Sequence, residues 1–256
     1  MKKTVVITGG ASGIGLSLVK KYCDKKYNVA VIDINDLKFS KSVNNVKLYK
    51  ADISDDKMIP IVMRSIYEDF KSIDVLINNA SKQTESSLNN LDYKIWKNVI
   101  DINLNGTFLC IKEAIKYMNE GSTILNIISV HYDKPRINKY HYDASKAGVA
   151  ILTRELAIEL ANKNITINAL SFGAVNTQMN ASWINDCSAR EKVLNKVPLK
   201  IIFEPSEIAL FASSIIDNYS KYTTGSIFTV DGGRSLIWKC YSQKWLFRLK
   251  KIWILF

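Results

Sequence analysis

The sequence predicts an α/β fold in which one doubly wound parallel sheet of about seven strands carries helices on both faces. Short apolar runs alternate with longer segments of helical spacing from Thr4 to about Thr123. This alternation is typical of βαβ units, in which a crossover helix joins two parallel strands. Most of the runs are almost continuously apolar, which indicates strands that helices cover on both sides.

Seven segments are predicted as strands because they are short and rich in apolar and β-branched residues. They are residues 4–8, 28–33, 46–52, 74–80, 122–129, 165–171 and 226–230. Helical spacing is evident at residues 16–23, directly after the first strand, and again at residues 142–161. No repeat or linker interrupts the order, so we expect one domain at residues 1–233 and an extension at residues 234–256.

The net charge of +11 is concentrated at the end of the chain. Residues 234–256 contain six basic residues and no acidic one, so they account for more than half of the excess. A charge of this size would raise nucleic acid or an anionic surface as a partner, but its distribution matters more than its sum. The distribution therefore argues against nucleic acid as a partner.

Composition also limits the compartment and the metal chemistry. The four cysteines are scattered and form no CxxC pair, so neither a metal site nor a disulfide framework is expected. The first apolar run is too short for a signal peptide, and no window reaches the roughly 18 apolar residues that a spanning helix needs. We expect a cytoplasmic protein.

A glycine-rich turn follows the first predicted strand. Residues 8–15 read TGGASGIG and lead into a helical pattern. Glycines let the backbone approach a pyrophosphate, whose charge the amides and the positive end of the helix can bind. Strand, turn and helix occur in the order that dinucleotide binding requires. The candidate cofactor-binding residues of this turn are Gly9, Ser12, Gly13, Ile14 and Gly15.

Asp33 is expected to select the cofactor. It ends the second predicted strand, near the distance at which a carboxylate accepts hydrogen bonds from the adenosine ribose hydroxyls. The same carboxylate would repel a 2′-phosphate, and neither Ser12 nor Ile34 supplies a cation for one. We therefore expect NAD in preference to NADP. The alternative is that Asp33 only stabilises the turn after the strand.

Further motifs occur in a fixed order, and together they resemble those of the short-chain dehydrogenase/reductase family over residues 3–233. The segments are Asp52-Ile53, Asn78-Asn79-Ala80, INLNG at 102–106, YDASK at 142–146, FGAVNT at 172–177, and TGS and VDGG at 224–226 and 230–233. The resemblance implies a Rossmann-type catalytic domain that transfers a hydride between carbon and nicotinamide. It places the adenine near Asp52 and Ile53, further cofactor contacts at Asn79 and Ala80, and the nicotinamide near Val175 and Thr177.

Tyr142 is the candidate acid/base. A phenol, with a pKa of about 10, is a poor base near neutrality unless its anion is stabilised. Lys146 follows it at helical spacing, so the two side chains share a helix face. We expect the ammonium to lower the phenol's pKa and to hold the cofactor ribose.

Ser129 and Asn103 complete the candidate catalytic set. Ser129 ends a predicted strand at the family's distance before the tyrosine, and its hydroxyl would steady the substrate oxygen. The resemblance implies that Asn103 links the lysine through a water to solvent. Two residues depart from the family pattern: Ser81 replaces a glycine and Phe172 replaces a proline.

The substrate is the least determined part of the prediction. The family places a specificity lid at residues 179–205, and the tryptophan, charged and amide side chains found there favour a small polar, sugar-like substrate. His131 and His141 flank the candidate serine and tyrosine and are expected to be pocket or surface residues. Two alternatives remain open: an NADPH-dependent reductase of an acyl thioester or other carbonyl, and a dinucleotide-binding protein without activity. The resemblance also implies a homodimer or homotetramer.

The extension at residues 234–256 has an amphipathic pattern. Aromatic and aliphatic residues recur at spacings of three and four between Trp238 and Phe256, with basic residues elsewhere. Such a helix suits an anionic membrane surface or a partner subunit. The alternative is that it packs on its own domain.

Overall fold

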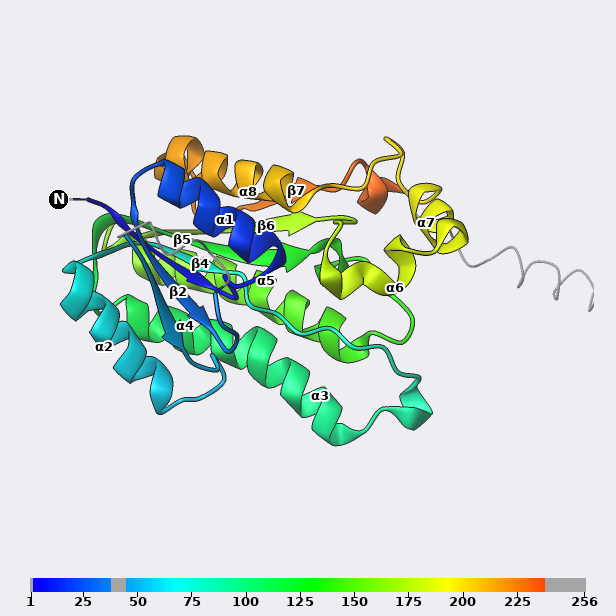
Figure 1. Cartoon of the computed structure of the whole chain (residues 1–256), viewed down its shortest axis with the longest axis horizontal. Helices are drawn as coiled ribbons and strands as arrows, with labels where there is room; N and C mark the ends of the chain where they lie inside the picture. The colour runs from blue at the N-terminus through cyan, green and yellow to red at the C-terminus, as the bar shows by residue number, and fades with distance from the viewer. Residues whose placement is uncertain (1, 38–44, 238–256) are drawn as a thin grey trace, which may run out of the picture.

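The computed structural model describes residues 2–37 and 45–237, in which seven parallel strands form one sheet in the order β3-β2-β1-β4-β5-β6-β7 (Figure 1). This confirms the predicted fold class. The strands are β1 (Thr4–Thr8), β2 (Asn28–Asp33), β3 (Val46–Lys50), β4 (Ile73–Asn78), β5 (Met118–Ser129), β6 (Thr166–Phe172) and β7 (Ile227–Val230).

Helices cover both faces of the sheet, as Figure 1 shows. One face carries α1 (Gly13–Asp24) and α8 (Pro205–Ser214), and the other carries α2 (Met58–Phe70), α4 (Gly106–Ala114) and α5 (Tyr140–Ala161). Helix α3 (Tyr93–Ile100) contacts α5, and α6 (Ala181–Ile184) and α7 (Cys187–Leu194) lie beyond the carboxyl ends of the strands. The described chain also contains π-helices at Asp101–Asn105 and Ile215–Tyr219, and 3-10 turns at Leu88–Asn90, Val130–Tyr132, Gln178–Asn180, Ser220–Tyr222 and Arg234–Leu236.

The strands are apolar on both sides because both sides are covered. In β1, Val5 and Ile7 pack in the core beneath α1 and α8, whereas Val6 packs in the core beneath α2 and α4. Successive strand residues point to opposite faces, so a strand between two helical layers needs apolar residues at every position. This explains the nearly continuous apolar runs of the sequence.

Several boundaries differ from the prediction, each for a local reason. Helix α1 already begins at Gly13, because Ser12 has extended backbone angles and stands as its N-cap. Strand β3 ends at Lys50, before Asp52, whose carboxylate accepts the backbone N–H of Ser54 and so turns the chain. Asn103 lies in the π-helix between α3 and α4 instead of a regular helix.

The predicted amphipathic pattern from Trp238 to Phe256 lies outside the described residues, so that prediction stays open. Of the described helices, none has the length and apolar character needed to cross a membrane. Within residues 2–37 and 45–237, no three His, Cys, Asp or Glu side chains gather as metal ligands would.

A buried chain of hydrogen bonds fixes α5 to the middle of the sheet. The Asn78 side-chain N–H donates to Asn126 Oδ1 at 2.8 Å, and Asn126 Nδ2 donates to Thr153 Oγ1 at 2.9 Å. Asn126 and Thr153 are fully buried, so neither has water as an alternative partner. The link joins β4, β5 and α5, and α5 also carries Tyr142 and Lys146.

Substituting Thr153→Val is expected to lower the free energy of unfolding by about 1–3 kcal/mol, because Asn126 Nδ2 loses its acceptor inside the core. Urea denaturation of the two proteins measures the difference. The control is Thr229→Val on the exposed side of β7, where a change within about 0.5 kcal/mol is expected. Equal losses in both variants would contradict the proposed anchoring.

Candidate active site

A cavity of about 1460 Å³ lies at the carboxyl ends of the strands. Its walls include residues at or just after the ends of β1, β2, β3, β4, β5 and β6, together with residues of α5. It brings together most of the candidate residues: Gly9, Ser12, Gly13, Ile14, Asp33, Asp52, Ile53, Asn79, Ala80, Ser129, Tyr142, Lys146, Val175 and Thr177. Gly15 and Asn103 are not among the lining residues and lie behind the wall.

The glycine-rich turn is packed directly against the end of β4. Gly9 has a φ of +67°, and a Cβ on it would lie 2.7 Å from the Ala80 Cα. Asn79 Nδ2 donates to the carbonyls of Thr8 and Gly9, both at 3.0 Å. A Cβ on Gly15 would overlap the Gly9 carbonyl, so this glycine lets α1 start against the turn. The turn is therefore held open for a ligand by contacts that only glycine permits.

Asp33 has two partners of its own in the protein. Its carboxylate accepts the backbone N–H of Ala11 at 2.9 Å and that of Asn35 at 2.9 Å. These bonds tie the glycine-rich turn to the end of β2, which is the structural role weighed as an alternative for this residue. Asp33 also lines the cavity, beside Ile34, whose exposed fraction is 60%. Asn35 Nδ2 also donates to Oδ1, at 3.2 Å, whereas among the described residues Oδ2 accepts only the Ala11 N–H and keeps a lone pair for a ribose hydroxyl.

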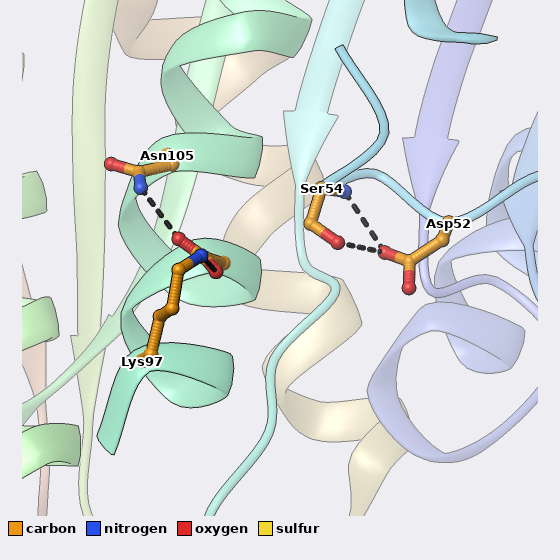
Figure 2. A network of polar contacts seen from close by, with 5 residues as sticks. Asp52, Ser54, Lys97 and Asn105 are labelled. Carbon is orange, nitrogen blue, oxygen red and sulfur yellow. Dashed lines mark hydrogen bonds and ion pairs between the residues drawn. The ribbon is translucent and has the colours of Figure 1, made fainter. Parts of the chain in front are cut away.

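Asp52, Asn98 of α3 and Ile102 of the π-helix Asp101–Asn105 contribute to the neighbouring part of the wall. Figure 2 shows Ser54 donating from its backbone N–H and its hydroxyl to Asp52 Oδ1, at 2.9 and 2.7 Å. The same view shows Asn105 and Lys97 converging on one carboxylate, that of Asp101. The contacts of Asp101 link α3 to the two ends of the short π-helix that carries Asn103.

Ser129, Tyr142 and Lys146 meet in the cavity. Ser129 ends β5 and shares a side-chain hydrogen bond with Tyr142, which lies near the start of α5. Lys146 Nζ lies 5.7 Å from the centroid of the Tyr142 ring and donates to the Ile127 carbonyl at 3.0 Å. All three side chains are buried, so charge changes on them are sensitive to one another and to any ligand.

Burial dominates the ionisation of this group. It raises the pKa of the Tyr142 phenol to about 12, against the Ser129 hydrogen bond, which lowers it. It also lowers the pKa of Lys146 to about 8. The expected lowering of the phenol's pKa by the ammonium is not found: burial outweighs the Ser129 hydrogen bond, and Lys146 is not among the groups that lower this pKa. Around pH 7 the phenol keeps its proton and the lysine is mostly charged.

The Asn103 side chain is fully engaged away from Lys146. Its Nδ2 donates to the Lys82 carbonyl and to Ser145 Oγ, both at 3.0 Å. Its Oδ1 accepts the backbone N–H of Lys82 at 2.8 Å and the Ser81 hydroxyl at 3.2 Å. The residue thus holds the segment after β4 against α5. The side chain has no spare donor for a water that leads to the lysine.

The two histidines have different positions. His131 lines the cavity, and its ring centroid is 6.5 Å from that of Tyr142. His141 is fully buried, contacts Thr84 through Nε2 and does not line the cavity. Of the charged and aromatic residues expected in the lid, Trp183 and Lys196 line the cavity.

The cavity lining includes residues that were not anticipated from the sequence, among them the cations of Lys134, Arg136 and Arg234. In the sequence, Lys134 and Arg136 lie between Ser129 and Tyr142. This position could have indicated that their side chains lie near the site. Arg234 directly follows the closing glycine pair and carried no signal of its own.

Known proteins resemble the chain over nearly its full length. The family described as enoyl-(acyl carrier protein) reductase matches residues 9–235. Glucose 1-dehydrogenase 2 of Bacillus subtilis (strain 168) is 32% identical over 250 residues, covering 91% of this chain and 95% of that protein. The 3beta-hydroxysteroid dehydrogenase 1 of Eggerthella lenta is 30% identical over 245 residues, with coverages of 91% and 94%.

Solved structures share the fold. The ligand-free aldohexose dehydrogenase of Thermoplasma acidophilum has a TM-score of 0.85 at 26% identity, covering 93% of this chain and 96% of that one. ElxO with NADP bound has a TM-score of 0.86 at 26% identity, with coverages of 93% and 100%.

The buried lysine predicts a pH dependence of stability. Because folding lowers the pKa of Lys146 to about 8 from 10.5, the unfolded chain binds more protons between these values, and this group makes stability rise with pH there. Lys146→Met is expected to remove that contribution. The measurement is the unfolding free energy of the wild type minus that of the variant, at pH 7.5 to 9.5. This difference should become more positive as the pH rises.

Lys20→Met, at an exposed position of α1, is the control and should show no such trend. A wild-type minus Lys146→Met difference that is constant over the same pH range would contradict the lowered pKa.

Proposed function

The chain belongs to the short-chain dehydrogenase/reductase family of oxidoreductases, and from that premise we propose that it is an NAD-dependent dehydrogenase/reductase of a small polar, sugar-like substrate. The observation that carries the proposal is the meeting of Ser129, Tyr142 and Lys146 in a cavity that continues to the glycine-rich turn and Asp33. Bound NAD would supply the nicotinamide ring that accepts or donates the hydride at the substrate's alcohol or carbonyl carbon.

The proton of that reaction is assigned to Tyr142. In the oxidising direction its phenol oxygen takes the proton of the substrate hydroxyl, and in the reducing direction it returns one. We propose that Ser129, hydrogen-bonded to the same phenol, holds the substrate oxygen as charge develops. Lys146, mostly charged at neutral pH, is proposed to hold the cofactor ribose.

Asn103 is proposed as a positioning residue. Its four side-chain hydrogen bonds join the segment after β4 to α5, which carries the tyrosine and the lysine. A relay through this residue to solvent, as the family resemblance implies, would have to use its main chain.

The proposed cofactor contacts follow the cavity wall. Gly9, Ser12, Gly13 and Ile14 surround the pyrophosphate site at the start of α1. The remaining contacts are Asp33 for the adenosine ribose, Asp52 and Ile53 for adenine, Asn79 and Ala80 beside the turn, Val175 and Thr177 for the nicotinamide end, and Gly15 for the packing of the helix.

NAD is proposed in preference to NADP because a carboxylate and no cation stands at the ribose position. Asp33 lines the cavity there, and the neighbouring Ile34 is exposed and uncharged. A 2′-phosphate would meet a like charge. The structural relative ElxO has NADP bound, so both cofactors belong in the test.

A sugar-like substrate is favoured by the relatives and by the cavity lining. Glucose 1-dehydrogenase 2 and the aldohexose dehydrogenase are named for sugars, whereas another relative is named for a hydroxysteroid. The lining also contains the polar side chains of His131, Trp183 and Asn180, of which Trp183 Nε1 donates to Asn180 Oδ1 at 3.2 Å.

Two alternatives predict different results. An NADPH-dependent reductase of acyl thioesters, in line with the description of the matching family, would prefer NADPH and reduce a thioester-linked substrate. A dinucleotide-binding protein without activity would not need a tyrosine, lysine and serine assembled beside the cofactor site. Cytoplasmic location and a homodimer or homotetramer stay predictions of the sequence.

Substituting Tyr142→Phe is expected to reduce turnover at least about a hundredfold, because the acid/base is removed. NAD affinity, measured by calorimetry, should change little. The matched control is Tyr140→Phe, two residues earlier on α5 and outside the cavity lining, which should keep wild-type turnover. Near-normal activity of Tyr142→Phe on its best substrate would refute the mechanism.

The double substitution Asp33→Ala with Ile34→Arg is expected to weaken NAD and strengthen NADP, each by about tenfold or more, since one charged hydrogen bond is lost and another is gained. Ile34→Arg alone, which keeps the carboxylate and its bonds to the turn, is the control and should improve NADP less. Steady-state titration of both cofactors measures the change. A wild-type protein that already prefers NADP would show the cofactor assignment to be wrong.

A further inference from the structure

The two ends of the cavity have opposite charge. Among the described residues that line it, the carboxylates are Asp33 and Asp52, both at the proposed adenosine end. Around Tyr142 the lining instead contains the cations of Lys134, Arg136 and Arg234. Cations that face a cavity without a facing carboxylate attract an anionic ligand. The substrate end therefore has a charge that a neutral sugar does not require.

Arg234 is the clearest part of this pattern. Among the described residues, its guanidinium has no hydrogen bond or ion pair, although burial and the nearby Arg136 both lower its pKa. The nearest acid, Asp231, is already committed to the backbone N–H groups of Gly233 at 2.8 Å and Ser235 at 2.6 Å. A partly desolvated guanidinium without a bound carboxylate is a costly arrangement unless a ligand completes it.

Arg136 is only partly neutralised. Its guanidinium lies 3.3 Å from Glu85 Oε1, but the buried Lys139 Nζ contacts the same oxygen at 3.0 Å. One carboxylate thus serves two cations. Asp143 accepts the backbone N–H of Arg136, and burial raises the pKa of this carboxyl. Neither acid lines the cavity, so Arg136 presents positive charge to it.

His131 links this cationic end to the reacting tyrosine. Its ring faces that of Tyr142 edge-on, and burial, with a smaller contribution from the cations of Arg234, Arg136 and Lys139, lowers its pKa to about 4. Nδ1 lies 2.9 Å from the Lys134 carbonyl, a contact that requires Nδ1 to be the donor. The neutral ring therefore keeps Nε2 as an acceptor, which suits a substrate hydroxyl.

We propose that Arg234 and Arg136 bind an anionic group of the substrate, a carboxylate or a phosphate, so that the enzyme acts on a polyhydroxylated acid or a sugar phosphate in preference to a neutral sugar. The inference rests on the proposed function, since it names the substrate class of the same site. Guanidinium groups bind either anion through paired hydrogen bonds.

The test compares glucose with two anionic counterparts of the same ring, glucuronate and glucose 6-phosphate, using the full chain and NAD. KM for at least one anionic compound is expected to be about tenfold or more below that for glucose, and to rise with salt while the KM for glucose does not. Which of the two compounds is preferred distinguishes a carboxylate from a phosphate.

Arg234→Gln is expected to raise KM for the preferred anion about 10- to 100-fold, the effect of losing a charged hydrogen bond, and to change KM for glucose by less than about threefold. Arg234→Lys keeps the charge and should recover part of the loss. The control is Arg64→Gln on the exposed side of α2, remote from the cavity lining, which should behave as wild type.

Two results would overturn the proposal. One is an anion-to-glucose KM ratio that Arg234→Gln and Arg136→Gln both leave unchanged. The other is a loss of NAD affinity in these variants with no change in substrate KM, which would assign the arginines to the cofactor phosphates.

Calorimetry of the three compounds with NADH present separates this inference from the proposed function. Arg234-dependent binding of an anion without any turnover would refute the dehydrogenase assignment and leave the anion site standing. Oxidation of glucose with no binding of either anion would refute the anion site and leave the assignment standing.

Discussion

The strand order reverses between β1 and β4, and the site depends on the crevice that this reversal leaves open. The chain leaves β1 toward α1 on one face of the sheet and leaves β4 toward α4 on the other, so no connection crosses the two carboxyl ends. Gly9 and Ala80 meet there backbone to backbone, in a contact that a side chain on Gly9 would break. The glycine requirement is therefore a consequence of the topology.

Burial then determines the chemistry of the groups around that crevice. The hydrogen-bonded chain Asn78–Asn126–Thr153 anchors α5 to the sheet. Tyr142 and Lys146, which α5 carries, are therefore held as buried residues in the cavity wall. Desolvation alone moves the pKa values of the phenol and the ammonium in opposite directions. Near neutral pH the lowered pKa of Lys146 costs folding stability, whereas Tyr142 is neutral in both the folded and the unfolded chain and costs none through ionisation.

The charge pattern of the cavity also orients what enters it. Carboxylates at one end favour ribose hydroxyls and disfavour phosphate, whereas arginines at the other favour an anion. Complementarity of this kind contributes to orientation and selectivity even where its net contribution to affinity is small. The anionic substrate proposed on this ground differs from the neutral sugars for which two of the relatives are named.

The sequence by itself determined the order of strands and helices, the glycine-rich turn and the spacing of Tyr142 and Lys146, because apolar periodicity, glycine at a turn and neighbours on one helix face are local properties. It placed Ser129 and Asp33 at strand ends, from which a parallel sheet brings them to one edge. Only the tertiary structure decided that Arg136 and Arg234 line the same cavity. It also decided that the Asn103 side chain forms hydrogen bonds with Lys82, Ser81 and Ser145. Burial in the folded chain is the largest cause of the pKa shifts of Tyr142 and Lys146. These features depend on distances between segments far apart in the chain and on how much water each group loses, and neither quantity has a pattern in the linear sequence.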